Sequence, residues 1–268
     1  MSKHSSGTPH LVSNGSGNHY NKELYAVVTG SNKGIGFEIC RQLASKGIIV
    51  VLTARDEKKG FEALEKLKSD GLSDHVVFCQ LDVVDPSSVA SLAEFIKSKF
   101  GRLDILVNNA GILGAKMDWD SLQSSEGSTE KEEVVSSFKK ITTQSYELGN
   151  ECLQTNYYGT KRMIEALNPL LQLSDSPRVV NVSSILGKLE PYRRESRRVN
   201  AYTRILAKKY PTFRINCVCP GWTKTDINNH IDKLTIEQGA QCPVKLALLL
   251  DDGPSGLFFA NNEPLSFV

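Results

Sequence analysis

Three glycines, Gly30, Gly34 and Gly36, directly follow a short apolar run near the start of the chain. The run at 24–28 predicts a strand, and the residues from Gly34 onward have the apolar periodicity of a helix. Glycine allows the backbone to turn sharply and to approach a ligand closely, and a helix N-terminus attracts a pyrophosphate. Glycines also mark ordinary tight turns. Their place in a first strand–helix unit is, however, the context that a dinucleotide-binding site requires.

Short β-branched runs alternate with longer amphipathic segments along the rest of the chain. This alternation is typical of βαβ units and a parallel sheet with helices on both faces. We therefore predict an α/β fold, a single Rossmann-type doubly wound parallel sheet in three layers. The predicted strands are 24–28, 48–53, 76–81, 103–107, 178–182 and 214–218, and the predicted helices are 34–46, 57–69, 87–100, 148–173 and 199–209.

Two segments fall outside this alternation. Residues 1–21 are rich in Ser, Gly, Asn and His, and we expect a flexible N-terminal tail before one domain at 22–268. Residues 114–149 form a polar, acidic insertion that is longer than most connections in compact domains. Because it follows the fourth strand, it is expected to overhang the ligand crevice. It either shapes a substrate pocket or is simply a solvated insertion.

The composition limits the classes of partner. The net charge of +2 gives no strong attraction to nucleic acid or to a membrane surface, and no apolar stretch is long enough to cross a bilayer. The six cysteines lack metal-ligand spacing, so we expect no metal and read them as buried free thiols. Free thiols and the absence of a secretory signal at the N-terminus are typical of a cytoplasmic protein.

The end of the second predicted strand favours one dinucleotide over the other. Arg55 lies 19 residues after Gly36, near the position where NAD-binding folds place an acid against the ribose hydroxyls. A guanidinium suits a 2′-phosphate instead, and Lys33 in the glycine loop adds a second positive charge. The acid Asp56 directly follows Arg55 and instead favours NAD, whose ribose hydroxyls an acid can bind. We predict NADPH/NADP as the cofactor.

The order of several motifs resembles the short-chain dehydrogenase/reductase family. The glycine loop at 29–36 is followed by Leu-Asp-Val at 81–83, Asn-Asn-Ala-Gly at 108–111, Asn-Val-Ser-Ser at 181–184 and Cys-Pro-Gly-Trp-Thr-Lys-Thr-Asp at 219–226. Within the family, the segments at 31–36 and 52–56 and the acidic insertion are similar to monomeric carbonyl reductases. Those at 200–204 and 253–259 are similar to plant menthone, neomenthol and salutaridine reductases.

The resemblance implies an NADPH-dependent reductase of a small ketone or aldehyde, with terpenoid-like compounds among its expected substrates. It assigns Asp82 and Val83 to the adenine, residues 109–111 to the adenosine ribose, and Thr225 to the nicotinamide half. Taken alone, an Asn pair at a strand end is also typical of an ordinary tight turn. The full set of expected cofactor residues is Gly30, Asn32, Lys33, Gly34, Ile35, Gly36, Arg55, Asp82, Val83, Asn109, Ala110, Gly111 and Thr225.

The same resemblance assigns Ser184 to polarising the carbonyl, Asn156 to a water relay and Tyr192 to proton donation. As alternatives, a Ser pair can be strand-end turn chemistry and a mid-helix Asn can face solvent. The family pattern also has a lysine four residues after the tyrosine, where this chain has Ser196. A Tyr-x-x-x-Lys pattern does occur at 157–161, but it precedes the serine motif, so its order is wrong.

The connection from Ser184 to Tyr192 is short, whereas the plant reductases have a long helical excursion there. Three hypotheses stay open: an active reductase, an NADPH-binding relative with impaired catalysis, and a chain destabilised by the shortening. The carbonyl-reductase subgroup favours a monomer. In the plant reductases, however, the missing excursion covers a surface that many family members use to assemble, so the oligomeric state is open.

Overall fold

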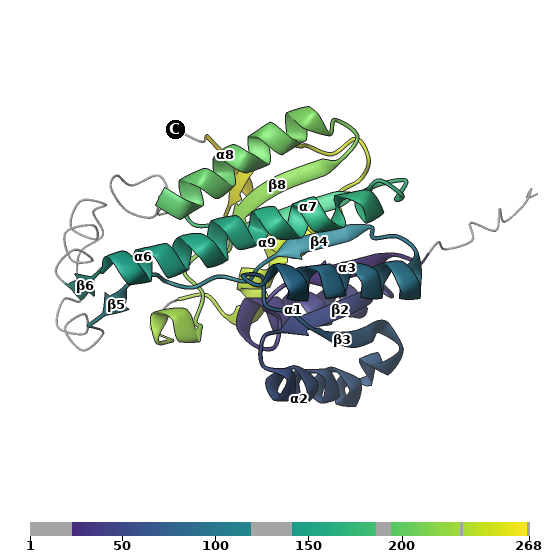
Figure 1. The fold of residues 1–268 in the computed structure, drawn as a ribbon, viewed down its shortest axis with the longest axis horizontal. Coiled ribbons are helices and arrows are strands. Elements are labelled where there is room, and N and C mark those ends of the chain that lie inside the picture. The colour runs from purple at the N-terminus through teal and green to yellow at the C-terminus, as the bar shows by residue number, and fades with distance from the viewer. Residues whose placement is uncertain (1–22, 119–140, 186–193, 231–232, 267–268) are drawn as a thin grey trace, which may run out of the picture.

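A mostly parallel sheet forms the centre of the computed structural model, which describes residues 23–118, 141–185, 194–230 and 233–266. Its strands are β1 (Tyr25–Val28), β2 (Ile49–Ala54), β3 (Val76–Gln80), β4 (Ile105–Asn108), β7 (Arg178–Val182), β8 (Arg214–Cys219), β9 (Phe258–Ala260) and β10 (Glu263–Leu265). Their order in the sheet is β10-β9-β8-β7-β4-β1-β2-β3 (Figure 1). Every neighbouring pair is parallel except β9 and β10.

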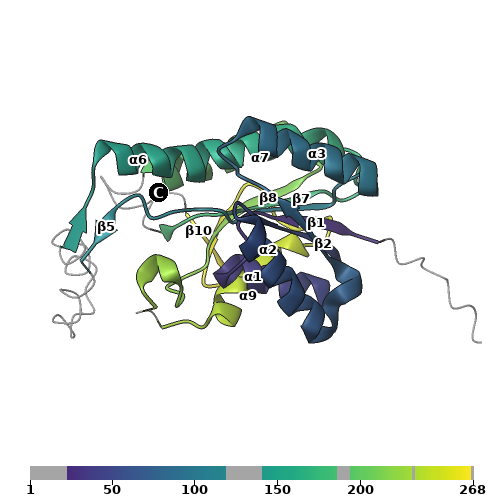
Figure 2. The same ribbon diagram turned by 60° about the horizontal axis from the view of Figure 1, so that its bottom comes forward.

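Helices cover both faces of this sheet (Figure 2). The first face carries α1 (Gly34–Ala44), α2 (Glu57–Leu67) and α9 (Ile236–Ala247). The second carries α3 (Pro86–Phe100), α7 (Thr160–Leu171) and α8 (Arg194–Lys209). A π-helical segment at Leu153–Gly159 joins α6 (Tyr146–Cys152) to α7, and shorter helical turns lie at Lys68–Leu72, Ser73–His75 and Asp226–Asn228.

The strands are apolar on both sides because both sides are covered. In β1, Ala26 and Val28 pack into the core under α1, α2 and α9, whereas Val27 packs into the core under α3 and α7. All three side chains are fully buried. The predicted doubly wound sheet in three layers is confirmed.

The chain reverses direction across the sheet between β1 and β4. Strands β2 and β3 lie to one side of β1, while β4, β7 and β8 lie to the other. The loops that leave the carboxyl ends of β1 and β4 therefore diverge and open a crevice, the usual ligand site of such sheets.

The acidic insertion begins and ends as a short antiparallel ribbon. Strand β5 (Lys116–Met117) pairs with β6 (Thr142–Thr143), and Met117 faces Thr142. Residues 119–140, like the N-terminal segment at 1–22, lie outside the described residues. In the part of the chain that the structure describes, no helix is long and apolar enough to cross a membrane.

Candidate active site

A cavity of about 1080 Å³ opens at the carboxyl ends of β1, β4, β7 and β8. This volume is at the upper end of the usual range for ligand pockets, so the cavity has room for a dinucleotide and a small second molecule. Every residue predicted to bind the cofactor lines it: Gly30, Asn32, Lys33, Gly34, Ile35, Gly36, Arg55, Asp82, Val83, Asn109, Ala110, Gly111 and Thr225. Ser184 and Asn156 line it too.

The glycine loop has the backbone that its sequence predicts. Gly30 and Gly34 have φ values of 61° and 58°, in the left-handed region that favours glycine. A Cβ on Gly36 would lie 2.4 Å from Asn109 Nδ2 and 2.6 Å from the Gly30 carbonyl oxygen. Residue 36 must therefore be glycine for the loop to close this tightly.

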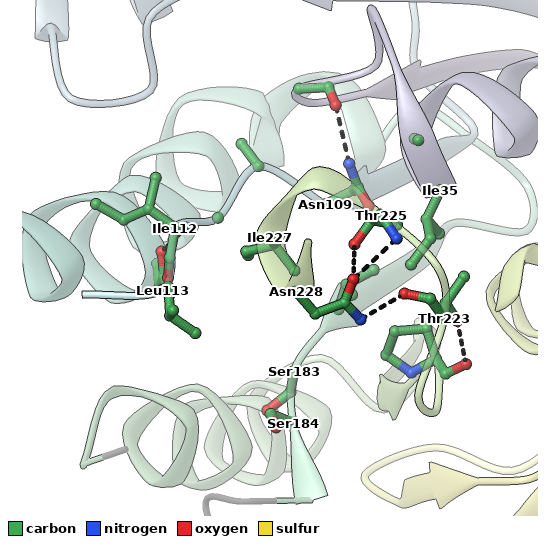
Figure 3. Close-up of a pocket in the computed structure, with 18 of the residues that line it drawn as sticks. Ile35, Asn109, Ile112, Leu113, Ser183, Ser184, Thr223, Thr225, Ile227 and Asn228 are labelled. Atoms are coloured by element: carbon green, nitrogen blue, oxygen red, sulfur yellow. Dashed lines mark hydrogen bonds between the residues drawn. The ribbon is translucent and has the colours of Figure 1, made fainter. Parts of the chain in front are cut away.

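Asn109 holds the glycine loop against the end of β4. Its Nδ2 donates to the carbonyl oxygens of Thr29 and Gly30, at 3.0 Å each. In return, Thr29 Oγ1 accepts from the backbone N–H groups of Asn109 and Ala110, at 2.9 Å each. Asn109 and Thr225 both line the cavity (Figure 3). These bonds fix the shape of the glycine loop, whose backbone can form an anion cradle.

The N-terminus of α1 is open to a ligand. Lys33 is its N-cap residue, and the Lys33 side chain makes no capping hydrogen bond. The first N–H groups of a helix have no partner within the helix, so they are available to phosphate oxygens here. The uncapped helix and the glycine cradle together fit the pyrophosphate of a dinucleotide.

Arg55 lies at the end of β2 and lines the cavity with an exposed side chain. Among the described residues it forms no ion pair. The neighbouring Asp56 is occupied elsewhere, because its carboxylate caps α2 by accepting from Lys59 N at 3.0 Å. This bond is the main reason that the pKa of Asp56 lies below its usual value. Asp56, the acid that favoured NAD over NADP in the sequence, thus serves as the N-cap of α2.

Lys33 spans the cavity to the loop that follows β8. Its ammonium group donates to the carboxylate of Asp226, and His230 Nε2 lies 3.0 Å from the other oxygen of the same carboxylate. The hydrogen bond and the charge of Lys33 hold the pKa of Asp226 below its usual value. Lys33 is therefore paired with Asp226, and among the residues that the structure describes Arg55 is the cavity-lining cation without an ion-pair partner.

The two serines at the end of β7 have different surroundings. Ser183 Oγ donates to Asn200 Oδ1 of α8 at 2.8 Å, which ties the strand end to that helix. Ser184, the predicted catalytic serine, lines the cavity next to it (Figure 3).

Asn156 lies within the π-helical segment and lines the cavity. Its Oδ1 accepts from Ile112 N and its Nδ2 donates to Ile112 O, both at 2.9 Å, and Nδ2 also lies 3.3 Å from Cys152 Sγ. The amide is thus bonded to the protein rather than facing solvent. It positions the loop that leaves β4.

Tyr192, the predicted proton donor, lies outside the described residues. Ser196 is described: it stands in the first turns of α8, is 6% exposed and lines the cavity. Glu195 beside it is 8% exposed and also lines the cavity. The side chain at the position where the sequence predicts the family's lysine therefore does line the cavity, but it is a hydroxyl.

An apolar section of the cavity was not predicted from the sequence. Ile112 and Leu113 follow β4, whereas Trp222 and Ile227 follow β8 (Figure 3 shows all of these except Trp222). They would have been found by extending the motifs past the carboxyl ends of these strands. The described ends of the acidic insertion reach the same cavity, through Ala115, Met117, Thr142 and Gln144.

Known proteins are similar to this chain over most of its length. The short chain dehydrogenase family model matches residues 24–235. The (+)-neomenthol dehydrogenase of Capsicum annuum is 45% identical over 305 residues, covering 91% of this chain and 97% of that protein. Mouse carbonyl reductase [NADPH] 3 is 33% identical, covering 85% of this chain and 91% of that protein.

Among solved structures, salutaridine reductase from Papaver somniferum has a TM-score of 0.77 and 44% identity, and covers 88% of this chain and 99% of that one. The chain belongs to the short-chain dehydrogenase family and is an oxidoreductase of that class. The alignment with the neomenthol dehydrogenase is longer than the 268 residues of this chain, so that relative has residues with no counterpart here.

Proposed function

We propose that the protein uses NADPH to reduce the ketone or aldehyde group of a small, terpenoid-like compound to an alcohol. One observation carries this proposal: the glycine cradle, Arg55, Ser184 and an apolar section all line a single cavity. The polar side of the cavity suits a phosphorylated dinucleotide, and the apolar side suits a hydrophobic carbonyl compound. The named activities of the relatives support the same reaction class.

The residues of this chain divide the chemistry between them. The N-terminus of α1 would hold the pyrophosphate and Arg55 the 2′-phosphate; NADPH, when bound, supplies the hydride. Ser184 would donate a hydrogen bond to the substrate oxygen and so polarise the carbonyl. Tyr192 would donate the proton that the developing alkoxide takes up. Asn156 keeps Ile112 and the loop after β4 in place in the cavity wall.

The first prediction tests turnover. Purified protein is expected to oxidise NADPH when a cyclic ketone such as menthone is added, and Ser184→Ala is expected to reduce kcat by roughly a hundredfold because one oxyanion donor is lost. The decrease in absorbance at 340 nm measures both rates. Wild-type turnover no faster than that of Ser184→Ala would contradict the proposed activity.

The second prediction tests the choice of cofactor. Arg55→Ala is expected to raise the Kd for NADPH by roughly ten- to a hundredfold, because a charge-assisted bond to phosphate is lost. The Kd for NADH, which lacks the 2′-phosphate, should change little. Titrating both nucleotides against both proteins measures this. An equal loss for NADH and NADPH would show that Arg55 acts on the fold rather than on the phosphate.

The buried Ser196 favours a second candidate function, an NADPH-binding protein with impaired catalysis. Without a neighbouring ammonium group, the pKa of a tyrosine stays near its ordinary value of about 10, which makes it a poor acid catalyst at neutral pH. This candidate predicts saturable NADPH binding without carbonyl reduction. Thermal melting with and without NADPH distinguishes this candidate from a destabilised chain that binds no nucleotide. A ligand that binds only the native state raises the melting midpoint, so the midpoint should rise only if the protein binds NADPH.

A further inference from the structure

Glu195 is a buried carboxylate with an incomplete set of partners. It lies in the first turn of α8 and is 8% exposed, and its Oε1 accepts no hydrogen bond. No ion pair among the described residues includes it. An acidic side chain in the first turn of a helix lies at the positive end of the helix dipole. A cation placed near it would lower the cost of burying an unpaired charge.

The position of Glu195 is the serine end of the cavity. It lies less than two helical turns before Asn200, whose Oδ1 accepts from Ser183 Oγ at 2.8 Å. Less than two turns is at most about 10 Å along the helix axis. Glu195 and Ser184 both line the cavity, and Figure 3 shows Ser184 next to Ser183. The carboxylate therefore stands close to the place where the carbonyl is to be held.

The cations of the cavity do not offset this charge. Lys33 and His230 both contact Asp226. Arg55 follows β2, and the order β7-β4-β1-β2 puts three strand spacings, or about 14 Å, between β2 and β7. The remaining charged residue of the lining is the acid Asp82. Of the charged residues that line the described cavity, Glu195 is therefore the one at the serine end; Arg197 and Arg198 follow it on α8 with exposed side chains and are not part of that lining.

We propose that Glu195 selects the oxidised form of the cofactor, so that NADP⁺ binds more tightly relative to NADPH than it would without this carboxylate. This inference rests on the proposed function, because hydride transfer to a carbonyl held by Ser184 requires the nicotinamide ring to lie beside that carbonyl. The oxidised ring has a positive charge and the reduced ring is neutral. A carboxylate within several ångströms attracts only the former, and this attraction corresponds to roughly tenfold in affinity in a partly solvated site.

The test is a pair of binding titrations with NADP⁺ and NADPH, on the wild type and on Glu195→Gln. The variant keeps the shape of the side chain and removes its charge. The ratio of the two Kd values is expected to shift roughly tenfold towards NADPH. Glu62→Gln is the matched control, because Glu62 is an exposed acid on α2, and its ratio should stay at the wild-type value. Ser196→Lys, which adds an ammonium beside Glu195, should shift the ratio in the same direction.

The ratio separates an electrostatic role from a structural one. A general disturbance of the site changes both Kd values by the same factor, and an unchanged ratio in Glu195→Gln would overturn the inference while leaving the proposed function intact. If the wild type binds neither nucleotide, the proposed function fails and the inference fails with it. A shift in Glu195→Gln and Ser196→Lys, with none in Glu62→Gln, supports the assignment.

Discussion

A Gly36→Ala variant is expected to bind NADPH roughly a hundredfold more weakly than the wild type, the loss that follows when charge-assisted bonds to a phosphate are broken. The new Cβ would lie 2.4 Å from Asn109 Nδ2 and 2.6 Å from the Gly30 carbonyl oxygen. Neither neighbour can retreat cheaply. The Gly30 oxygen belongs to the backbone, and Asn109 Nδ2 already bonds to the oxygens of Thr29 and Gly30. The loop must therefore open and carry its N–H groups away from the pyrophosphate.

Nucleotide titration and thermal melting together measure this change. The overpacking itself is expected to cost about 1–3 kcal/mol of folding free energy, so the variant should remain folded at room temperature. Gly149→Ala is the matched control, because Gly149 is also helical and the nearest atom to its added Cβ is 3.6 Å away. The control should bind NADPH like the wild type. A Gly36→Ala Kd within threefold of the wild-type value would show that the loop tolerates the side chain.

Local backbone requirements explain why the conformation of the glycine loop could be predicted from the sequence. A glycine at a left-handed position or a close approach leaves a trace in the sequence itself, as Gly30 and Gly36 do. The strands were predictable for a similar reason, because burial on both faces requires continuous apolar runs. The segment at 178–182 coincides with β7, and the other central strands differ by one or two residues at their ends.

The elements that were missed depend on tertiary packing. Helix α9 contains Gly239 and Pro243, which weaken a helical pattern. It forms nonetheless, because a capping box at Thr235 and Gln238 starts it and its apolar face packs on α1. Strands β9 and β10 are three residues each, too short for a periodic signal. The prediction of six strands was therefore incomplete at the β8 edge of the sheet.

Other contacts around the cavity were less predictable because they join distant parts of the chain. The Lys33–Asp226 ion pair connects residues 193 positions apart, and no local sequence pattern predicts it. The burial of Glu195 and Ser196 likewise depends on how α8 is set against β7. A sequence motif shows which residue types are present along one segment. It does not show which side chains from other helices or strands lie beside that segment, because this depends on how the elements pack.

That packing depends on a buried chain of polar side chains. Asn108 Nδ2 of β4 donates to Asn181 Oδ1 of β7, and Asn181 Nδ2 donates to Thr203 Oγ1 of α8, both at 2.9 Å. Thr203 Oγ1 in turn donates to Val199 O at 2.8 Å. Asn181 and Thr203 are fully buried. Hydrogen bonds require specific distances and directions, so this series of buried bonds fixes how α8 lies against β7. It thereby brings Ser196 of α8 to the cavity.

Replacing Asn181 by leucine is therefore expected to destabilise the fold by about 2–4 kcal/mol, because two buried hydrogen bonds are lost together. Asn108 Oδ1 already has no partner, so its whole amide would be left unpaired. A domain of this size should then melt roughly 5–10 °C lower, which calorimetry measures directly. Asn150→Leu, at an exposed position of α6, should leave the midpoint unchanged. If Asn181→Leu melts like this control, the polar chain does not hold α8, and packing alone must set its register.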